Sequence, residues 1–459
     1  MVNGVLVYFC DEKSISNLVR YGILHELLKS NQLILTTLEI AEKFSYIPNL
    51  IAYKSNWTKN EESLFADYLY LQNLMQRKNK PLNIVLRTRI FGPYKIRSLK
   101  KAIIFSQNFY NTLIRINWIL VLKSRNLTPD QLLIRLREKR FLSAGDFEII
   151  SEILTANNVK SVSCFTTLRS PLLFDFVSAC NNQNIETNLF PDSWDNFSSN
   201  PYIPNQITNL FVWSKQQELE IDLLHPYFKG NVEVYGSYRI SKSMDNFKSD
   251  VQKNYFANRN RLKLLYLEGY IFEDFHFNLQ KIIEALINLS KVRKNISEVD
   301  IVFRNYPMSK QHEKKKVFDF NHKLVIKGIT FSFTQSKLPF VVDDLAGIDF
   351  VITDCTTAAL EAAFSGLDIV FIGSKQSPRY IDTIKVYKFS FSKDLNRFFP
   401  VVNLSKYFST RRLSKVFQVF LEKIEITEEN LNHKDTIYLK YRYFAEPLKV
   451  EKMQKIFTL

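Results

Sequence analysis

The segment from Phe350 to Gly366 reads Phe-Val-Ile-Thr-Asp-Cys-Thr-Thr-Ala-Ala-Leu-Glu-Ala-Ala-Phe-Ser-Gly and predicts a strand, a turn and a helix. Thr356 and Thr357 stand where the helix should begin, and threonine is a favourable N-cap. Gly366 is suited to end the helix, and Asp368 to Ile372 supplies the next apolar strand. A strand, a helix and a second strand in this order form the repeating unit of a parallel α/β sheet.

The turn of this segment also predicts an anion site. Free backbone N–H groups and the helix dipole favour a phosphate at a helix N-terminus, and in a doubly wound sheet ligands bind at this edge. Glu361 follows Thr357 by about one helical turn, so we expect it to reach ribose hydroxyls while Thr356 and Thr357 hold phosphate. A βαβ unit with an ordinary capped helix explains the same residues, and this alternative stays open.

Short apolar segments of strand length recur along the chain and alternate with amphipathic, helix-like segments. They are Val5 to Cys10, Gln32 to Thr37, Leu50 to Tyr53, Ser161 to Phe165, Thr187 to Phe190, Leu210 to Trp213, Val232 to Tyr235, Leu262 to Leu267, Val299 to Phe303, Leu324 to Phe333, Phe350 to Thr353 and Asp368 to Ile372. This alternation predicts parallel sheets covered on both faces, hence the α/β class.

The chain has 459 residues, which is too long for one ordinary core and suits two domains. The polar stretch from Ile240 to Arg261 has no apolar period and is interpreted as the linker between them. We expect a first domain over residues 1–255 with a helical insertion at about 61–140, and a second domain over 256–435. Residues 436–459 form a basic, aromatic tail of helical pattern.

Two more segments of the second half end a predicted strand with a candidate ligand. One strand ends at Arg304 and runs into a turn at Pro307, and arginine suits bidentate phosphate contact. Another ends at Glu268 and Gly269, where the absence of a Cβ leaves room for a ligand. A surface arginine and a tight turn are the alternative explanations.

In the first half, the loop Asp192 to Ser199 follows a strand and gathers two carboxylates and a tryptophan. Asp195 or Asp192 could remove a proton from an acceptor hydroxyl as general base, and Asp11 at the end of the first strand is a third candidate. Trp194 is suited to stack on a sugar or a base. Alternatively, the aspartates cap turns and Trp194 belongs to the core.

Several function classes are excluded by the sequence. There is no HExxH spacing, no GxxxxGK[ST] and no GxGxxG after a strand, so we expect no zinc, no P-loop and no dinucleotide cofactor. The net charge of +16 favours anionic partners, but no nucleic-acid-binding signature accompanies it. Four scattered cysteines and the lack of a signal-peptide pattern predict a cytoplasmic protein without metal or disulfides.

The order strand, Arg-x-x-Pro, then Asp-x-Thr-Thr-x-x-x-Glu-Ala-x-x-x-Gly resembles the C-terminal half of GT-B-fold glycosyltransferases. The most similar set is bacterial surface-polysaccharide enzymes: CDP-glycerol glycerophosphotransferase-like proteins and the CMP-sugar sialyl- and Kdo-transferases. This resemblance implies that Thr356 and Thr357 bind donor phosphate and that Glu361 holds ribose. The family's His-Pro pair corresponds to Tyr306-Pro307, where the histidine is missing and Arg304 is the expected substitute.

The resemblance covers about residues 160–460. It implies a GT-B fold, with two Rossmann-like domains that face each other across a cleft. It also implies that the C-terminal domain binds the nucleotide sugar, that the N-terminal domain binds the acceptor, and that the final helix crosses back. The family's Trp-His-Gly loop corresponds to Trp194 followed by Asp195, which departs from polyol-phosphate transferases and leaves Asp195 as a candidate base.

We therefore expect a glycosyltransferase that is independent of metal and uses an aspartate base. Its donor would be a CMP-linked nonulosonate or Kdo-type sugar or another NDP-sugar, and its acceptor a capsule, O-antigen or related glycan. A sugar-nucleotide 2-epimerase-like enzyme and a non-catalytic scaffold of polysaccharide assembly are the competing hypotheses. The near absence of histidine from the candidate loops disfavours the epimerase.

The stretch from Lys100 to Arg125 is basic and aromatic. We expect it to lie on the inner face of the cytoplasmic membrane, where anionic lipid attracts basic residues, and to present a lipid-linked acceptor. A helix pair packed within the first domain is the alternative.

Overall fold

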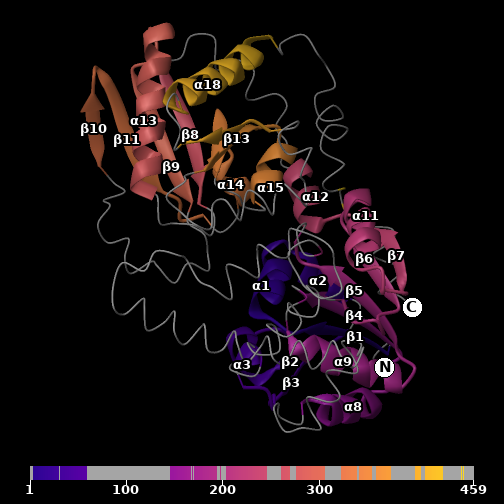
Figure 1. Cartoon of the computed structure of the whole chain (residues 1–459). Coiled ribbons are helices and arrows are strands. Elements are labelled where there is room, and N and C mark those ends of the chain that lie inside the picture. The colour runs from indigo at the N-terminus through magenta and orange to yellow at the C-terminus, as the bar shows by residue number, and fades with distance from the viewer. Residues whose placement is uncertain are drawn as a thin grey trace, which may run out of the picture. The chain divides into compact units, whose positions relative to one another are not determined.

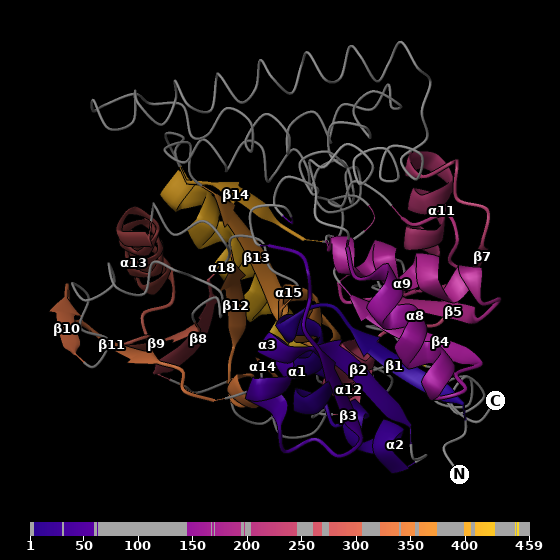
Figure 2. The same cartoon turned by 90° about the horizontal axis from the view of Figure 1, so that it is seen from below.

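The computed structural model describes residues 4–29, 32–58, 62, 145–166, 168, 170–193, 197, 203–245, 260–268, 275–304, 322–338, 341–353, 358–373, 399–404, 409–426, 446 and 448. The chain divides into two compact units (Figures 1 and 2). Unit 1 comprises Met1–Tyr238 with Tyr443–Leu459, and unit 2 comprises Arg239–Arg442. The first boundary follows Tyr238, which is before residue 255, where we expected it from the sequence. The second follows Arg442, which is after the expected position 435.

Unit 1 is built on a parallel sheet whose seven strands follow the order β3-β2-β1-β4-β5-β6-β7. The strands are β1 (Val5–Phe9), β2 (Leu33–Thr37), β3 (Leu50–Tyr53), β4 (Ser161–Thr166), β5 (Glu186–Pro191), β6 (Asn209–Val212) and β7 (Asn231–Val234). The chain leaves β1 in one direction toward β3 and later resumes on its other side at β4. The switch point of this Rossmann-like sheet therefore lies between β1 and β4.

Helices cover both faces of this sheet, as expected. They are α1 (Glu12–Arg20), α2 (Ile23–Lys29), α3 (Leu38–Ala41), α8 (Phe147–Ala156), α9 (Pro171–Asn182) and α11 (Lys215–Leu224), with a 3₁₀ turn at Glu42–Phe44. Helix α12 (Tyr238–Asp245) begins at the last residue of this part of unit 1 and belongs to unit 2 from Arg239 onward. Along β1, Leu6 and Tyr8 belong to the core that contains α8 and α9, which lie side by side in Figure 2. Val7 and Phe9 belong to the opposite core, with side chains of α1 and α2.

Unit 2 has a second seven-stranded sheet, in the order β10-β11-β9-β8-β12-β13-β14. Its strands are β8 (Arg261–Leu267), β9 (Glu298–Arg304), β10 (Lys323–Ile326), β11 (Ile329–Gln335), β12 (Phe350–Thr353), β13 (Asp368–Gly373) and β14 (Val401–Asn403). Its helices are α13 (Phe275–Val292), α14 (Val341–Asp344), α15 (Ala358–Phe364) and α18 (Ser409–Ile426). Helices α13 and α18 pack side by side over one face of the sheet (Figure 1).

Two sequence expectations need correction. Leu324 to Phe333 is not one strand, because the chain reverses between β10 and β11, which pair antiparallel. Lys327 and Gly328 both have positive φ, at 53° and 79°, as the commonest two-residue hairpin turns require. The segment from Ile240 to Arg261, which we interpreted as a linker, begins within helix α12. Ile240 of this helix is fully buried.

The segment after residue 442 returns to unit 1. The backbone N–H of Ser237 donates to the Glu446 carbonyl oxygen at 2.7 Å, and the N–H of Glu446 donates to the Trp213 carbonyl oxygen at 2.8 Å. Leu448 packs against the unit 1 core that contains Phe190 and Tyr235. Among the described residues, no helix has the length and apolarity to cross a membrane.

A buried carboxylate ties the chain before residue 59 to the chain after residue 144. Asp175 of α9 is fully buried and accepts hydrogen bonds from Trp57 Nε1 and from the Asp146 N–H, both at 2.7 Å. The Asp146 carboxylate in turn accepts from Ser55 Oγ at 2.6 Å and from the Asn56 N–H at 2.6 Å. The expected helical insertion, 61–140, lies outside the described residues apart from position 62.

Candidate functional site

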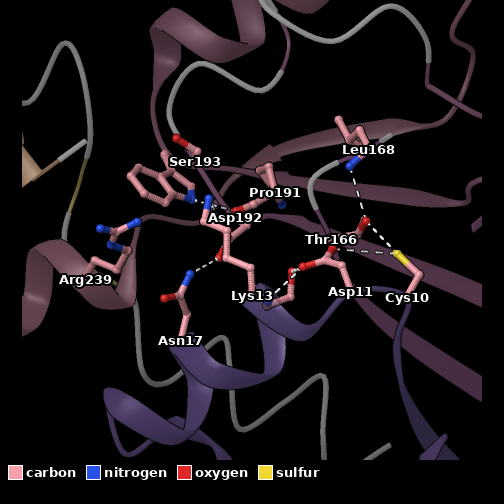
Figure 3. A network of polar contacts seen from close by, with 12 residues as sticks. Cys10, Asp11, Lys13, Asn17, Thr166, Leu168, Pro191, Asp192, Ser193 and Arg239 are labelled. Carbon is pink, nitrogen blue, oxygen red and sulfur yellow. Dashed lines mark hydrogen bonds and ion pairs between the residues drawn. The ribbon is translucent and has the colours of Figure 1, made fainter. Parts of the chain in front are cut away.

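The carboxyl ends of β1, β4 and β5 meet at the switch point of unit 1, and polar side chains gather there (Figure 3). Cys10 and Asp11 directly follow β1, Thr166 ends β4, and Asp192 directly follows β5. Asp11 is the N-cap of α1, because its Oδ1 accepts from the Ser14 N–H at 2.8 Å and from Ser14 Oγ at 2.9 Å. The edge at which ligands bind to open α/β sheets thus carries two carboxylates.

Asp192 is 3% exposed, and three side chains neutralise or solvate its charge. Lys13 Nζ lies 3.0 Å from Oδ2, and Asn17 Nδ2 donates to Oδ1 at 2.8 Å (Figure 3). The Tyr238 hydroxyl donates to Oδ1 at 3.3 Å. Lys13 and Asn17 stand four residues apart on α1, so they lie on one helix face. A buried carboxylate with a cationic partner and two hydrogen bonds is held rigidly in place.

The Asp11 carboxyl is more exposed than that of Asp192, and its own pKa is raised. Withdrawal from water and the negative charge of Asp192 raise the pKa of Asp11, and the hydrogen bonds from Ser14 only partly oppose this. Asp11 remains partly exposed, so a substrate atom can approach it. A carboxylate with a raised pKa is a stronger base at neutral pH than an ordinary aspartate.

Cys10 completes the network without adding a nucleophile. Its Sγ lies 2.8 Å from Thr166 Oγ1. Burial, followed by the charge of Asp11, raises the pKa of the Cys10 thiol, so the sulfur stays protonated and unreactive. Across the described part of the chain, no group of three histidine, cysteine, aspartate or glutamate side chains is placed to hold a metal ion.

In unit 2, Arg304 ends β9 as expected, but its guanidinium is already engaged. Its Nη1 donates to the Leu338 carbonyl oxygen at 3.0 Å and forms an ion pair with Asp344 of α14 at 2.5 Å. Asp344 is buried and also accepts from Ser336 Oγ. This network fixes the loop after β11, and phosphate binding by Arg304 stays a prediction. Glu268, next to β8, is buried at the carboxyl edge of the same sheet.

Glu361 lies on α15, as predicted, and is fully buried. Its Oε1 accepts from Arg239 Nε at 2.9 Å and from Arg239 Nη2. The guanidinium side chain is itself only 11% exposed. Nearby, Ser365 Oγ donates to the Ser243 carbonyl oxygen at 3.2 Å. The Arg239 pairing fixes α15 to α12, and ribose binding by Glu361 stays a prediction.

The remaining predicted site residues lie outside the described residues. They are Trp194, Asp195, Gly269, Pro307, Thr356 and Thr357, together with the stretch Lys100 to Arg125. Conversely, sequence reasoning missed Lys13, Asn17, Tyr238 and Arg239. The i, i+4 spacing of Lys13 and Asn17 directly after Asp11 was a usable signal, whereas Tyr238 and Arg239 stood beside a segment interpreted as a linker.

The raised pKa of Asp11 makes a prediction about stability. Above about pH 4, where an unfolded aspartate ionises, wild-type stability should fall as pH rises through the raised folded pKa, because the folded state holds this proton more tightly. Asp11→Asn keeps an N-cap but carries no charge, so it should be more stable than wild type at pH 7 and lose this advantage near pH 4. Urea unfolding at both pH values measures this, and an advantage independent of pH would contradict it.

The buried Arg239–Glu361 pair makes a second prediction. Arg239→Met leaves the Glu361 carboxylate buried without its cation, and should lower the free energy of unfolding of unit 2 by about 3 kcal/mol. Lys281→Met is the matched control, because it removes a cation from the partly exposed pair with Glu284 and should cost about 0–1 kcal/mol. Urea unfolding compares the two variants, and equal losses would show that the buried pair is not the stronger constraint.

No family model matches the chain, and no curated protein matches it. Solved structures are similar. The UDP-GlcNAc 2-epimerase from Methanocaldococcus jannaschii has a TM-score of 0.50 and 11% identity, and the alignment covers 99% of each chain. A putative UDP-N-acetylglucosamine 2-epimerase from Listeria monocytogenes has a TM-score of 0.47 and 13% identity, with 97% of this chain and 91% of that chain covered.

The spinosyn rhamnosyltransferase SpnG is similar as well, with a TM-score of 0.44 and 9% identity over 99% of this chain and 100% of that one. At such identities a structural likeness shows the fold alone. The prediction of an α/β protein with two Rossmann-like domains is confirmed, and the fold of the chain is of the GT-B type.

Proposed function

We propose that the chain is a nucleotide-sugar-dependent glycosyltransferase in which Asp11 is the general base. The observation that carries this proposal is the pair of carboxylates at the switch point of unit 1. Asp192 is buried and pinned by Lys13, while Asp11 is partly exposed and has a raised pKa. A partly exposed carboxyl whose pKa is raised by burial and by a charged neighbour is typical of acid–base sites.

The chemistry follows from this difference. The acceptor hydroxyl gives its proton to the Asp11 carboxylate, and its oxygen forms a bond to the anomeric carbon of the donor sugar. The bond from that carbon to the phosphate oxygen breaks, and the nucleotide leaves with the electron pair. The fixed charge of Asp192 keeps the proton affinity of Asp11 high, which favours the transfer at neutral pH. Asp192 itself is then a positioning residue.

On the donor side, we propose that the turn before α15 binds the donor phosphate through Thr356 and Thr357. A helix N-terminus stabilises the charge that develops on the leaving phosphate, so the proposal needs no metal. Arg304 and Glu361 contribute by holding the loop after β11 and helix α15 in place, in addition to the phosphate and ribose contacts expected from the sequence. Pro307, Glu268 and Gly269 complete the proposed donor site.

The finer assignments remain part of this proposal. The donor is a CMP-linked nonulosonate, a Kdo-type sugar or another NDP-sugar, and the acceptor is a bacterial surface glycan or its lipid-linked precursor. The resemblance of the Asp354 to Gly366 pattern supports the surface-glycan assignment. The +16 charge supports an anionic partner, including the inner face of the cytoplasmic membrane.

A sugar-nucleotide 2-epimerase is the second candidate. A solved enzyme of that name shares the fold over 99% of both chains. Two neighbouring carboxylates also suit removal and return of a proton on a sugar carbon. The two candidates differ in their products, because an epimerase needs no acceptor and forms no glycoside.

Nucleotide binding separates both enzymes from a non-catalytic scaffold. In a thermal-shift panel of CMP, CDP, UDP, GDP and dTDP, we expect one nucleotide to stabilise the protein, because a ligand that binds only the folded state raises its stability. At a concentration of 100 times Kd the gain is about 2.7 kcal/mol. The nucleotide that stabilises names the donor class. A panel without any shift would overturn the enzyme proposal in favour of the scaffold.

Kinetics with a sugar donor that carries the stabilising nucleotide test whether Asp11 is the general base. Asp11→Asn should lower kcat by about 10²–10⁴-fold, the usual contribution of a general base, and leave nucleotide affinity unchanged. Burial and the charge of Asp192 both raise the pKa of Asp11. Asp192→Asn removes the second of these causes, so the acid limb of the pH–rate profile, over which Asp11 loses its proton, should move to lower pH. Asp195→Asn is the comparison variant. If it abolishes transfer while Asp11→Asn does not, Asp195 is the base and our assignment is wrong.

A further inference from the structure

A residue from far along the chain continues the hydrogen bonding between β6 and β7. The last register pair of these two strands is Val212 and Val234. Beyond this pair, the Glu446 N–H donates to the Trp213 carbonyl oxygen at 2.8 Å, and the Ser237 N–H donates to the Glu446 carbonyl oxygen at 2.7 Å. Glu446 belongs to the part of unit 1 that follows residue 442, and its backbone bridges the ends of the two strands.

The two backbone groups that Glu446 satisfies are in buried residues. Trp213 is 2% exposed and Ser237 is 1% exposed, so solvent has little access to either of them. A buried backbone group that loses its partner is unfavourable, and both residues would have to move if Glu446 were displaced. Leu448 helps to hold Glu446 in place, because it packs against the core on the α1 face of the sheet.

Trp213 connects Glu446 to the main chain on both sides of Asp192. Its Nε1 donates to the Pro191 carbonyl oxygen at 3.0 Å. Its N–H donates to Gln217 Oε1 at 2.6 Å, and Gln217 Nε2 donates to the Ser193 carbonyl oxygen at 3.1 Å. Pro191 and Ser193 flank Asp192 in the sequence (Figure 3). The backbone of this aspartate is therefore held before and after it.

A second route leads from Glu446 to the Asp192 carboxylate. Ser237 directly precedes Tyr238, whose hydroxyl donates to Asp192 Oδ1 at 3.3 Å. The Glu446 backbone is thus connected to the same aspartate twice, through Trp213 to its main chain and through Tyr238 to its side chain. Such a network restricts the position of Asp192 more than any single contact does. Displacement of Glu446 would loosen both routes at once.

We propose that the Glu446 backbone positions Asp192, so that the site at the switch point is complete only when the segment after residue 442 is docked on unit 1. This inference rests on the proposed function, because it assigns this segment a role in the surroundings of the general base. Glu446 touches no reacting atom and acts only through Trp213 and Tyr238. Docking of a distant segment thereby becomes a condition for proton transfer at Asp11.

The chemical consequence follows from the charges next to Asp11. Burial and the negative charge of Asp192 raise the pKa of Asp11, whereas Lys13 lowers it. Glu12 on α1 and the Cys10 thiol after β1 are also next to Asp11, and burial keeps this thiol protonated. A displaced Asp192 raises the pKa of Asp11 less, so Asp11 becomes a weaker base.

Two variants at position 446 test this role in the full chain. Proline has no backbone N–H, so Glu446→Pro removes the hydrogen bond to Trp213, whereas Glu446→Ala changes the side chain alone. In hydrogen exchange followed by mass spectrometry, peptides that contain residues 190–193 and 237–238 should exchange about 3–10-fold faster in Glu446→Pro than in Glu446→Ala, the value of one hydrogen bond. Peptides from α13 of unit 2 should exchange equally in both variants.

Kinetics with donor and acceptor show whether this loosening reaches the base. Glu446→Pro should move the acid limb of the pH–rate profile to lower pH, as expected for Asp192→Asn, and should leave nucleotide affinity unchanged. In the Asp192→Asn background it should not move the limb further, because two changes that act through the same residue are not additive. Glu446→Ala should keep the acid limb of the wild type.

Leu448→Ala is a second, milder variant in case Glu446→Pro does not fold. It should loosen the segment after residue 442 and produce the same two effects in smaller size. Leu448→Met keeps the volume of the side chain and should produce neither effect. Stabilisation by the nucleotide that stabilises the wild type checks that each variant is folded.

The outcomes separate this inference from the proposed function. Equal exchange of residues 190–193 in the two variants at position 446, or a further shift of the acid limb in the Asp192→Asn background, would overturn the positioning role. If the wild type transfers sugar while exchange is equal, the positioning role alone is overturned. Faster exchange in Glu446→Pro, without transfer by the wild type, would support the positioning role and overturn the transferase.

Discussion

The burial of the Asp192 carboxylate at the switch point is the constraint on which the candidate site depends. A charge at 3% exposure needs a cation and hydrogen bonds, and α1 and α12 supply them through Lys13, Asn17 and Tyr238. The same negative charge acts on Asp11, where it adds to the effect of burial and raises the pKa. The Asp192 side chain thus fixes α1 against the end of β5 and contributes to the raised pKa of Asp11.

The parallel architecture explains why these side chains meet although they are far apart in sequence. Asp11 and Asp192 are separated by most of unit 1, but each directly follows a strand that ends at the same edge. The short apolar segments of the sequence predicted alternating strands and helices, and thus the fold class. Ligands bind at the carboxyl ends of strands in such sheets, so residues at these positions were reasonable site candidates. The Glu361 segment was predicted for the same reason, and helix α15 is found where its pattern places it.

The sequence could not predict which side chains form ion pairs with these residues, because such pairs depend on packing between distant elements. Arg239 follows β7 in a polar stretch, and nothing local shows that it neutralises Glu361, 122 positions later. Arg304 was predicted to face a ligand, but its ion pair with Asp344 requires the placement of α14. The hairpin at Lys327 and Gly328 was missed because two strands without a strong turn signal look like one apolar run. The stacked rings of Phe165, Phe190 and Phe211 come together only because β4, β5 and β6 lie side by side.

The clamp around Asp175 has a consequence for how this chain can vary. Because Ser55, Asn56 and Trp57 are bonded to Asp146 and Asp175, the two flanks of the intervening segment are held together independently of what lies between them. A Cβ at position 145 would come within 2.5 Å of an Asp175 oxygen, so the glycine there belongs to the same fastening. The entropy of closing a loop grows only slowly with its length. The number and identity of the residues between these flanks can therefore change while the parallel sheet of unit 1 keeps its register.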